Sequence, residues 1–291
     1  MAKTWTWISG ISRDGLSLSR AALILAACAT TLSGCGEESP AAPKAVVGDS
    51  PLLALTPTEY NNTVRELLAL PSDGTTWPEL PTDVAALVPV RATGEGTFGT
   101  KAPNVPPWPW PLTAESGVDG FEGIAQGQST SAYRVEQLQR AAMTYAAYAL
   151  VSPVFFTCDA QVWAKLDKAA QQDCAHKSVV RLSQRAYRRP LSSDERTRLE
   201  TFFAANWADS TAHEAIVLTL AGVLQSPAFL YRQESGETAL AVGKVRPLSS
   251  WEMASRLSYL LWDSMPDAAL FAAASKDELA TQAQVQAQAE R

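Results

Sequence analysis

Histidine and cysteine are scarce in this sequence, with two histidines and four cysteines among 291 residues. A structural zinc site needs four ligands, and His176 and His213 are the two imidazoles that the chain offers. The Cys-x-x-Cys-His motif of haem attachment is absent, and neither histidine stands beside a Gly-x-Ser-x-Gly elbow. The sequence therefore predicts no metal, no cofactor and no catalytic residue.

Positive charge and long apolar runs are also in short supply. The chain has 24 Lys and Arg against 30 Asp and Glu. Nonspecific binding to nucleic acid needs a basic field, so this balance argues against a nucleic-acid partner. No stretch is apolar for long enough to form a transmembrane helix. We therefore expect any attachment to a membrane to be through lipid.

The first 34 residues have the pattern of an export signal, because basic residues precede an apolar stretch from Ala21 to Leu32 and small residues follow it. The stretch ends in Leu32-Ser33-Gly34-Cys35, which resembles the lipobox of bacterial lipoproteins. In that motif the cysteine is acylated and becomes the mature N-terminus. Leu25-Ala26-Ala27-Cys28 is a rival lipobox, and an ordinary secretory signal without lipid is a further alternative.

Cysteine parity favours the later lipobox. Cleavage before Cys35 leaves one lipidated cysteine together with Cys158 and Cys174, which can pair in an oxidising compartment. Cleavage before Cys28 would leave Cys35 as an odd thiol. We therefore predict lipid on Cys35 and a disulfide between Cys158 and Cys174. Loss of residues 1–34 removes three basic residues and one acidic residue, leaving 21 against 29 and a net charge of −8.

Helix caps and apolar stripes recur along the rest of the chain. Five Ser or Thr residues stand three positions before a Glu and predict capping boxes that open helices: Thr56, Ser192, Thr211, Ser249 and Ser275. The expected apolar stripes are Tyr60, Val64, Leu67 and Leu68; Tyr133, Leu138, Ala142, Tyr145 and Ala149; Leu199, Phe202 and Phe203; Ile216, Leu220, Val223 and Leu224; and Met253, Leu257, Leu260 and Leu261. No alternating stretch competes as a strand. The sequence predicts an all-α, multi-helical fold.

Residues 71 to 120 lack sustained periodicity and are rich in Pro, Gly and Trp. The part from Pro103 to Pro111 must run extended, close to polyproline II. Its tryptophans could form a stacking platform for sugar or peptide, or they could pack back onto the domain, as Trp more often does. Asp119 and Glu122 could serve glycoside cleavage as paired carboxylates, but closeness in sequence does not establish a pair.

The run Ser178–Glu200 contains two expected helices joined by an Arg-Arg-Pro-Leu corner. Pro190 disfavours helix for the residue before it, so we expect the first helix to stop at Arg189. Four cations before the corner fall at helical spacing and predict one anion-binding face: Lys177, Arg181, Arg185 and Arg188. Such a face could bind an anionic polymer or a lipid headgroup. The alternatives are pairing with acidic residues across the corner, or a solvated charge stripe.

Several segments carry a family resemblance. Leu55–Leu68 and Gly120–Ala142 form one set, Arg185–Leu191 and Leu224–Arg232 a second, and Ala254–Trp262 followed by Pro266-Asp267 a third. These sets resemble, in order, the domains of unknown function DUF1587, DUF1595 and DUF1592 of large exported planctomycete and myxobacterial proteins. Glu122 and Gly123 depart from the Gly-Phe-Asp/Ser-Asn pattern of the first domain. The resemblance implies no established activity.

Composition and resemblance together divide the chain into five parts. We expect a lipoprotein signal peptide over 1–34, a flexible tether over 35–50, and a DUF1587-like helical region with a Pro/Trp-rich loop over 51–152. A DUF1595-like domain over 153–236 and the start of a DUF1592-like domain over 246–291 follow. Relatives continue with the rest of the third domain, so the chain resembles an N-terminal portion, and we expect weak packing after about Thr281.

Two classes of function stay open at this point. One is a lipid-anchored helical module for binding or assembly at the cell envelope, facing the periplasm or the exterior. Its partner would be an envelope protein or a polysaccharide. The other is the N-terminal part of an extracellular enzyme or redox partner that acts on polymer. The binding module is favoured, because no catalytic constellation emerges from the residues.

Overall fold

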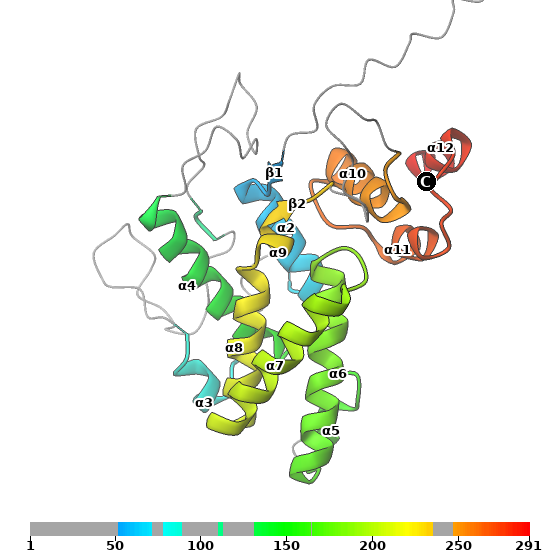
Figure 1. Cartoon of the computed structure of the whole chain (residues 1–291). Coiled ribbons are helices and arrows are strands. Elements are labelled where there is room, and N and C mark those ends of the chain that lie inside the picture. Colours follow the sequence, from blue (N-terminus) through cyan, green and yellow to red (C-terminus); the bar gives the residue numbers. More distant parts are fainter. Residues whose placement is uncertain (1–51, 72–77, 89–109, 113–130, 164, 235–246) are drawn as a thin grey trace, which may run out of the picture. The chain divides into compact units, whose positions relative to one another are not determined.

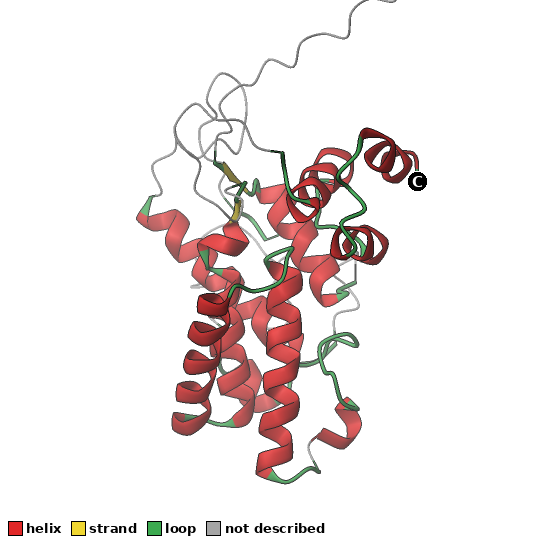
Figure 2. Cartoon of the chain, turned by 45° about the vertical axis from the view of Figure 1, so that its right-hand side comes forward, coloured by secondary structure: helices red, strands yellow, loops and turns green. Residues whose placement is uncertain are grey.

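The computed structural model describes residues 52–71, 78–88, 110–112, 131–163, 165–234 and 247–291. In these ranges the chain forms helices and one small sheet, which confirms the predicted all-α, multi-helical class (Figure 1, Figure 2). The helices are α2 (Pro57–Leu68), α3 (Thr82–Ala85), α4 (Ala132–Ala149), α5 (Ala160–Trp163), α6 (Lys168–Ala186), α7 (Ser193–Asp209), α8 (Ala212–Leu224), α9 (Pro227–Leu230), α10 (Ser250–Trp262), α11 (Ala268–Ser275) and α12 (Gln282–Glu290).

The sheet consists of two antiparallel strands of two residues each, which the sequence did not predict. Strand β1 (Leu53–Ala54) pairs with β2 (Tyr231–Arg232), with Leu53 opposite Arg232. The N–H of Leu55 extends the pairing by donating to the carbonyl of Leu230 at 2.8 Å. The sheet thereby fixes the segment before α2 to the segment after α9.

Side-chain caps begin most of the helices because the first N–H groups of a helix lack partners within it. Reciprocal capping boxes form at Thr56, Ser192 and Ser249, as predicted. Thr211 caps α8 by accepting from the N–H of Glu214. The box predicted at Ser275 is wrong: this serine ends α11, and the next helix opens instead at a box formed by Thr281 and Gln284.

The chain after Ser275 closes α11 rather than opening a helix. Asp277 has a φ of 57°, in the left-handed region, and the N–H of Glu278 donates back to the carbonyl of Ala273 at 2.9 Å. This is the geometry in which a helix ends with its last carbonyls satisfied. The Ser-x-x-Glu pattern therefore occurs here within a helix terminus.

The larger hydrophobic core is built around α8. This helix packs against α4, α6 and α7, and its predicted stripe of Ile216, Leu220, Val223 and Leu224 is buried. The buried stripe of α2 joins the same core. In the predicted stripes of α4 and α7, one residue each is exposed: Tyr133 to 50% and Phe202 to 46%. Phe202 lies against Gly222, where a Cβ would meet its ring at 2.9 Å, so glycine permits the close approach of α7 to α8.

A smaller core joins α10, α11 and the turn before α12. Its six buried residues are Ala254, Leu257, Leu270, Ala273, Ala274 and Leu279. The predicted stripe of α10 is wrong in its second half, because Leu260 is 76% exposed and Leu261 is 48% exposed. Helix α12 buries none of its residues, which agrees with the weak packing expected after Thr281.

Cys158 and Cys174 form a disulfide, the pair that the sequence predicts, with their Cα atoms 6.0 Å apart. The bond ties the loop that contains α5 to the first half of α6. Among the described helices, none is both long and apolar enough to cross a bilayer. Cys28 and Cys35, with their rival lipoboxes, lie outside the described residues.

Candidate functional site

Arg188 stands just past the end of α6, which stops earlier than the sequence predicts. The last helical residue is Ala186, Tyr187 caps the helix, and Arg188 has a φ of 60°. Residues other than glycine seldom adopt this left-handed conformation. Arg188 therefore leaves the helical face of the residues before it, and its side chain is only 4% exposed.

The guanidinium of Arg188 is surrounded by main-chain carbonyl groups. Its Nη1 donates to the carbonyls of Ala186 and Phe229, both at 3.1 Å. Its Nη2 donates to those of Ala228 at 3.0 Å, Phe229 at 3.1 Å and Tyr231 at 2.9 Å. Three of these acceptors belong to the end of α9 and the start of β2, where a helix leaves its carbonyls unpaired. Arg188 thus fixes this segment to the end of α6.

Tyr259 connects α10 to the same place. Its hydroxyl lies 2.8 Å from Oγ1 of Thr63 on α2 and 3.4 Å from Nη1 of Arg188. The guanidinium groups of Arg232 and Arg188 lie over its ring, 5.0 Å and 5.7 Å from the centroid. Both positions favour a cation–π attraction. Tyr259 is 2% exposed and belongs to the larger core, unlike the rest of the buried face of α10.

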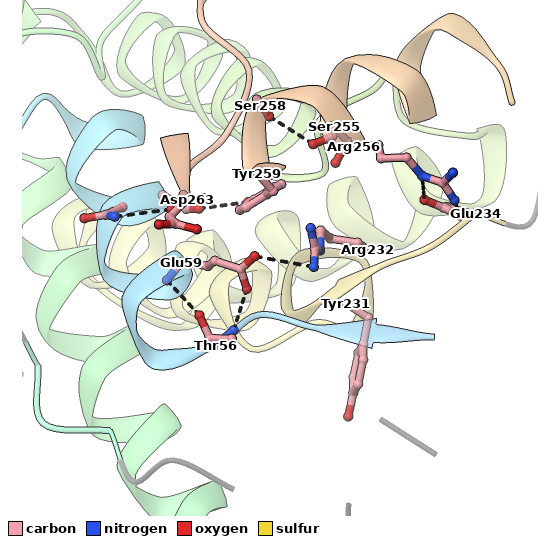
Figure 3. Close-up of polar contacts among 12 residues, drawn as sticks. Thr56, Glu59, Tyr231, Arg232, Glu234, Ser255, Arg256, Ser258, Tyr259 and Asp263 are labelled. Carbon is pink, nitrogen blue, oxygen red and sulfur yellow. Dashed lines mark hydrogen bonds and ion pairs between the residues drawn. The ribbon is translucent and has the colours of Figure 1, made fainter. Parts of the chain in front are cut away.

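Glu59 is the acidic member of this group. One carboxylate oxygen accepts from the N–H of Thr56 at 2.8 Å and completes the cap of α2, while the other lies 3.4 Å from Nη2 of Arg232 (Figure 3). The Glu59 side chain is 8% exposed and the Arg232 side chain 18% exposed, so the pair is largely desolvated. We call Glu59, Thr63, Arg188, Arg232 and Tyr259 the Arg188 cluster.

Two contacts at the edge of the Arg188 cluster further connect its elements. Arg256 on α10 forms a bidentate ion pair with Glu234, which follows β2 (Figure 3). The side-chain amide of Asn62 on α2 donates to the carbonyl of Asp263, which caps α10 in a left-handed conformation. Both contacts therefore connect α10 to segments that also carry members of the Arg188 cluster, α2 and the chain after β2.

The cluster uses its polar groups to hold protein segments together. Removing one member of a buried polar network leaves the others without partners, at a cost of several kcal/mol. The segments joined are α2, the end of α6, the α9–β2 turn and α10. These contacts fix the four segments to one another.

The predicted anion-binding face is only partly assembled. Lys177 pairs with Asp173 at 2.6 Å, and Arg181 donates to the carbonyls of Val154, Phe155 and Phe156. Arg185 is half-buried, and burial, with the nearby charge of Arg181, lowers its pKa. Arg188 does not share this face, because α6 ends before it. Of the cations on this face, Lys177 thus pairs within its own helix, and Arg181 satisfies carbonyl groups of the loop after α4.

The acidic residues across the corner pair with cations outside the predicted anion-binding face. Arg189 and Glu195 form a bidentate pair at 2.7 and 2.8 Å. Glu200 lies 3.2 Å from Arg196 and 3.5 Å from His176. Arg189 therefore provides the link across the corner.

The histidines lie in separate surroundings. Nδ1 of His213 is 2.7 Å from a carboxylate oxygen of Asp83, and the His213 ring lies 5.3 Å from that of Trp163, tilted by 31°. The hydrogen bond from His213 lowers the pKa of Asp83. Within the described ranges, no three His, Cys, Asp or Glu residues lie close enough together to hold a metal ion.

Part of the Trp-rich loop packs onto the larger core. The ring of Trp110 meets Tyr145 edge to face at 6.1 Å, and the main-chain N–H of Trp110 donates to Oδ1 of Asn61 at 2.9 Å. Trp110 therefore packs back onto the domain, which is the second of the two alternatives for these tryptophans. Trp108, Asp119 and Glu122 lie outside the described residues.

A second feature is a pocket of about 150 Å³ between α4, β1 and the segment from α8 to β2. Among the described residues that line it, Arg134 is the one charged side chain, and most of the others are apolar. Arg134 is 8% exposed and Tyr60, at the α2 side, is 1% exposed. Tyr231 also lines the pocket, and Figure 3 shows its ring pointing away from Glu59 and Arg232. The pocket could not be predicted from the sequence, since its lining residues come from three separated segments of the chain, 54–60, 134–138 and 225–231.

The contacts of Arg232 and Tyr259 in the Arg188 cluster were not predicted from the sequence. For Glu59, only its part in the cap of α2 was predicted. The available signal was their position: each lies inside a segment that carried the family resemblance. Their convergence needed the fold, because Glu59 and Tyr259 are 200 positions apart in the chain.

Two family models match parts of the chain. The model described as Protein of unknown function (DUF1595), PSD5, matches residues 174–234. The model described as Protein of unknown function (DUF1592), PSD4, matches residues 248–291. The DUF1587 resemblance was not detected. No curated protein and no solved structure matches the chain. The chain is therefore similar over these two segments to two families of unknown function, and Arg188 and Arg232 of the first segment meet Tyr259 of the second.

Proposed function

We propose that this chain is an exported, lipid-anchored helical module for binding or assembly at the cell envelope. The observation that carries the proposal is the disulfide between Cys158 and Cys174. Disulfides persist in oxidising compartments and are rare where thiols are kept reduced. The bond supports the export signal over residues 1–34, and the parity argument then favours acylation of Cys35.

The use of the buried polar groups supports binding rather than catalysis. A catalytic acid, base or nucleophile must face its substrate. In the Arg188 cluster, Arg188 donates to main-chain carbonyls, and Glu59 accepts from a main-chain N–H and pairs with Arg232. These groups are used to position helices. The pocket beside α4 supports the same function, since it offers a small concave surface.

The lipid anchor is tested by labelling cells that express the full chain with a radioactive fatty acid. We expect label on the wild-type protein and on Cys28→Ala, and recovery of both in the membrane fraction. Cys35→Ala should carry no label and should be released from the membrane. Label lost in Cys28→Ala but kept in Cys35→Ala would assign the lipid to the rival lipobox. An unlabelled wild-type protein in the soluble fraction would contradict lipid anchoring altogether.

A further inference from the structure

We propose that the segment Trp110–Leu112 is exchanged between copies of this protein, so that the segment of one copy binds Asn61, Gln137 and Tyr145 of a second copy. We call these three residues, from α2 and α4, the Asn61 clamp. The exchange rests on the assembly part of the proposed function, and it names the partner as a second copy of the chain. It does not depend on the lipid anchor.

The side-chain amide of Asn61 contacts both main-chain polar groups of one residue. Its Nδ2 donates to the carbonyl of Trp110 at 3.1 Å, and its Oδ1 accepts from the main-chain N–H of Trp110 at 2.9 Å. Nδ2 also donates to the carbonyl of Pro57 at 2.8 Å, and Oδ1 also accepts from the hydroxyl of Tyr145 at 3.0 Å. An amide offers two donors and two acceptor positions, so all four are used. The contacts with α2 and α4 orient the amide, and the other two recognise the main chain of the segment.

Burial makes the Asn61 clamp unfavourable when it is empty. Asn61 is 4% exposed, and Tyr145 is fully buried. Burial raises the pKa of the Tyr145 hydroxyl, which therefore stays protonated and remains a donor to Asn61. Without a bound segment, one N–H and one acceptor position of the Asn61 amide would lose their partners, which is costly for a buried polar group. The clamp therefore favours occupation by the segment of its own chain or by that of another.

Two apolar side chains anchor the segment beside these main-chain contacts. The ring of Trp110 meets Tyr145 edge to face at 6.1 Å, and Leu112 is buried in the larger core. Gln137 donates to the carbonyl of Pro111 at 3.2 Å. The N–H of Leu112 donates to the carbonyl of Trp110 at 2.8 Å, which closes a three-residue turn. Main-chain hydrogen bonds combined with side-chain anchors are the means by which proteins bind short peptides.

The segment is joined to the rest of the chain by long connections. Residues 89–109 precede it and residues 113–130 follow it, which are 21 and 18 residues. Chains of these lengths reach at most about 70 Å and 60 Å. A folded domain of this size is about 45 Å across. The segment is therefore long enough in its connections to reach the Asn61 clamp of an adjacent copy.

A second copy carries the one sequence that the clamp already fits, because Trp-Pro-Leu occurs once in the chain. Exchange of an identical segment is a low-cost route to a dimer, since the same contacts form in both arrangements. What is lost is the high local concentration of the segment on its own chain. A chain with a vacant clamp should therefore associate best with a chain whose segment is unheld.

The association is tested with purified full chains in detergent that carry donor or acceptor dyes on C-terminal tags, titrated by Förster transfer. Trp110→Ala leaves the clamp without its tryptophan, and Asn61→Ala leaves the segment without its clamp. We expect these two variants to bind each other at least tenfold more tightly than either binds itself. Arg140→Ala, on α4 and paired with Glu136, is the matched control for Asn61→Ala. It should bind Trp110→Ala at least tenfold more weakly than Asn61→Ala does, because its own segment stays held.

The peptide acetyl-Trp-Pro-Leu-amide provides a second measurement, by ligand-observed NMR, that does not need the Asn61→Ala variant. It should bind Trp110→Ala at least tenfold more tightly than the wild type, whose own segment occupies the clamp. Methylation of the tryptophan N–H of the peptide removes the donor to Asn61 and should weaken binding by roughly tenfold. The unmethylated peptide should also separate the Trp110→Ala and Asn61→Ala chains.

Equal affinity of the peptide for Trp110→Ala and the wild type, or an unaffected methylated peptide, would overturn the Asn61 clamp as a binding site. Peptide binding without association of the two variant chains would overturn the exchange between copies. If Asn61→Ala does not fold, Gln137→Ala replaces it as the chain with the weakened clamp, with an expected gain of about threefold over Arg140→Ala. The fatty-acid labelling of Cys35 is independent of every one of these outcomes.

Discussion

The two hydrophobic cores of the chain differ in how they are held together. The larger core draws on helices from α2 to α9, and it contains fully buried aromatic side chains such as Tyr60, Tyr145 and Phe229. The smaller core has six buried residues, three of them alanine, and its last helix buries none. Burial stabilises roughly in proportion to the apolar area removed from water, so the smaller core has far less to hold it.

Helix α10 contributes residues to both cores. Ala254 and Leu257 of this helix face the smaller core, whereas Tyr259 enters the larger one. Leu260, Leu261 and Trp262 are exposed at its end. A single helix thus belongs to both cores, and the Arg188 cluster is the polar contact by which the weaker core is held to the stronger one.

The largest effect is expected from loss of the Arg188 side chain. Arg188→Ala removes the five hydrogen bonds to carbonyls and leaves those buried acceptors unpaired, which should lower the free energy of unfolding by about 3–5 kcal/mol. Urea denaturation measures this. Arg196→Ala, which breaks an exposed pair with Glu200, should cost less than about 0.5 kcal/mol. Equal effects of the two variants would contradict the role given to Arg188.

Removal of the disulfide should weaken the larger core alone. Replacing Cys158 and Cys174 together by Ala releases a loop of sequence separation 16, which corresponds to about 3 kcal/mol of lost stability. The variant should also lose its sensitivity to reductant in thermal unfolding. Hydrogen exchange in α10–α12 should stay as in the wild type. A comparable loss of protection in both cores would show that they unfold as one unit.

Two leucines of α10 sharpen the contrast within one helix. Leu257→Ala should cost about 2 kcal/mol, at the low end for core leucines, because the smaller core can collapse onto the space. Leu260→Ala should change stability by less than about 0.5 kcal/mol, since Leu260 is 76% exposed. The free energy of opening α10–α12 by native-state hydrogen exchange measures both. A larger cost for Leu260 would restore the stripe that the sequence suggested.

The smallest effect concerns pH at the corner of the larger core. Hydrogen bonds from Arg189 lower the pKa of Glu195 from 4.5 to about 2. A depressed carboxyl pKa contributes stability above pH 4.5, and that contribution disappears as the pH falls through about 2. Glu195→Gln should therefore cost about 1–2 kcal/mol at neutral pH, after allowance for the solvent around half-exposed Arg189, and should flatten the acid limb. An unchanged pH profile in the variant would sink this assignment.

Much of the fold could be predicted because its signals are local. The caps at Thr56, Ser192 and Ser249 depend on residues three positions apart, and the stripe of α8 depends on one helical period. The prediction at Ser275 was wrong because the Ser-x-x-Glu pattern can also occur at the C-terminal end of a helix. The disulfide followed from counting cysteines, which needs no geometry.

The site was harder to predict because its parts meet only after folding. Helical spacing placed Arg188 beside Lys177, Arg181 and Arg185, but the spacing has meaning only while the helix continues, and α6 ends at Ala186. The left-handed turn at Arg188 then sends the side chain into the core. Likewise, periodicity could not tell which side of α10 faces which core. Tertiary contacts decide that.

The most direct test of the account is hydrogen exchange in Tyr259→Ala compared with the wild type. Tyr259 is the residue of α10 whose hydroxyl and ring both contact other members of the Arg188 cluster. We expect faster exchange throughout α10–α12 in the variant, while the slowly exchanging amides of α4, α6 and α8 remain slow. Unchanged exchange in α10–α12, or an equal loss of protection in α4, α6 and α8, would contradict the claim that this cluster joins the smaller core to the larger one.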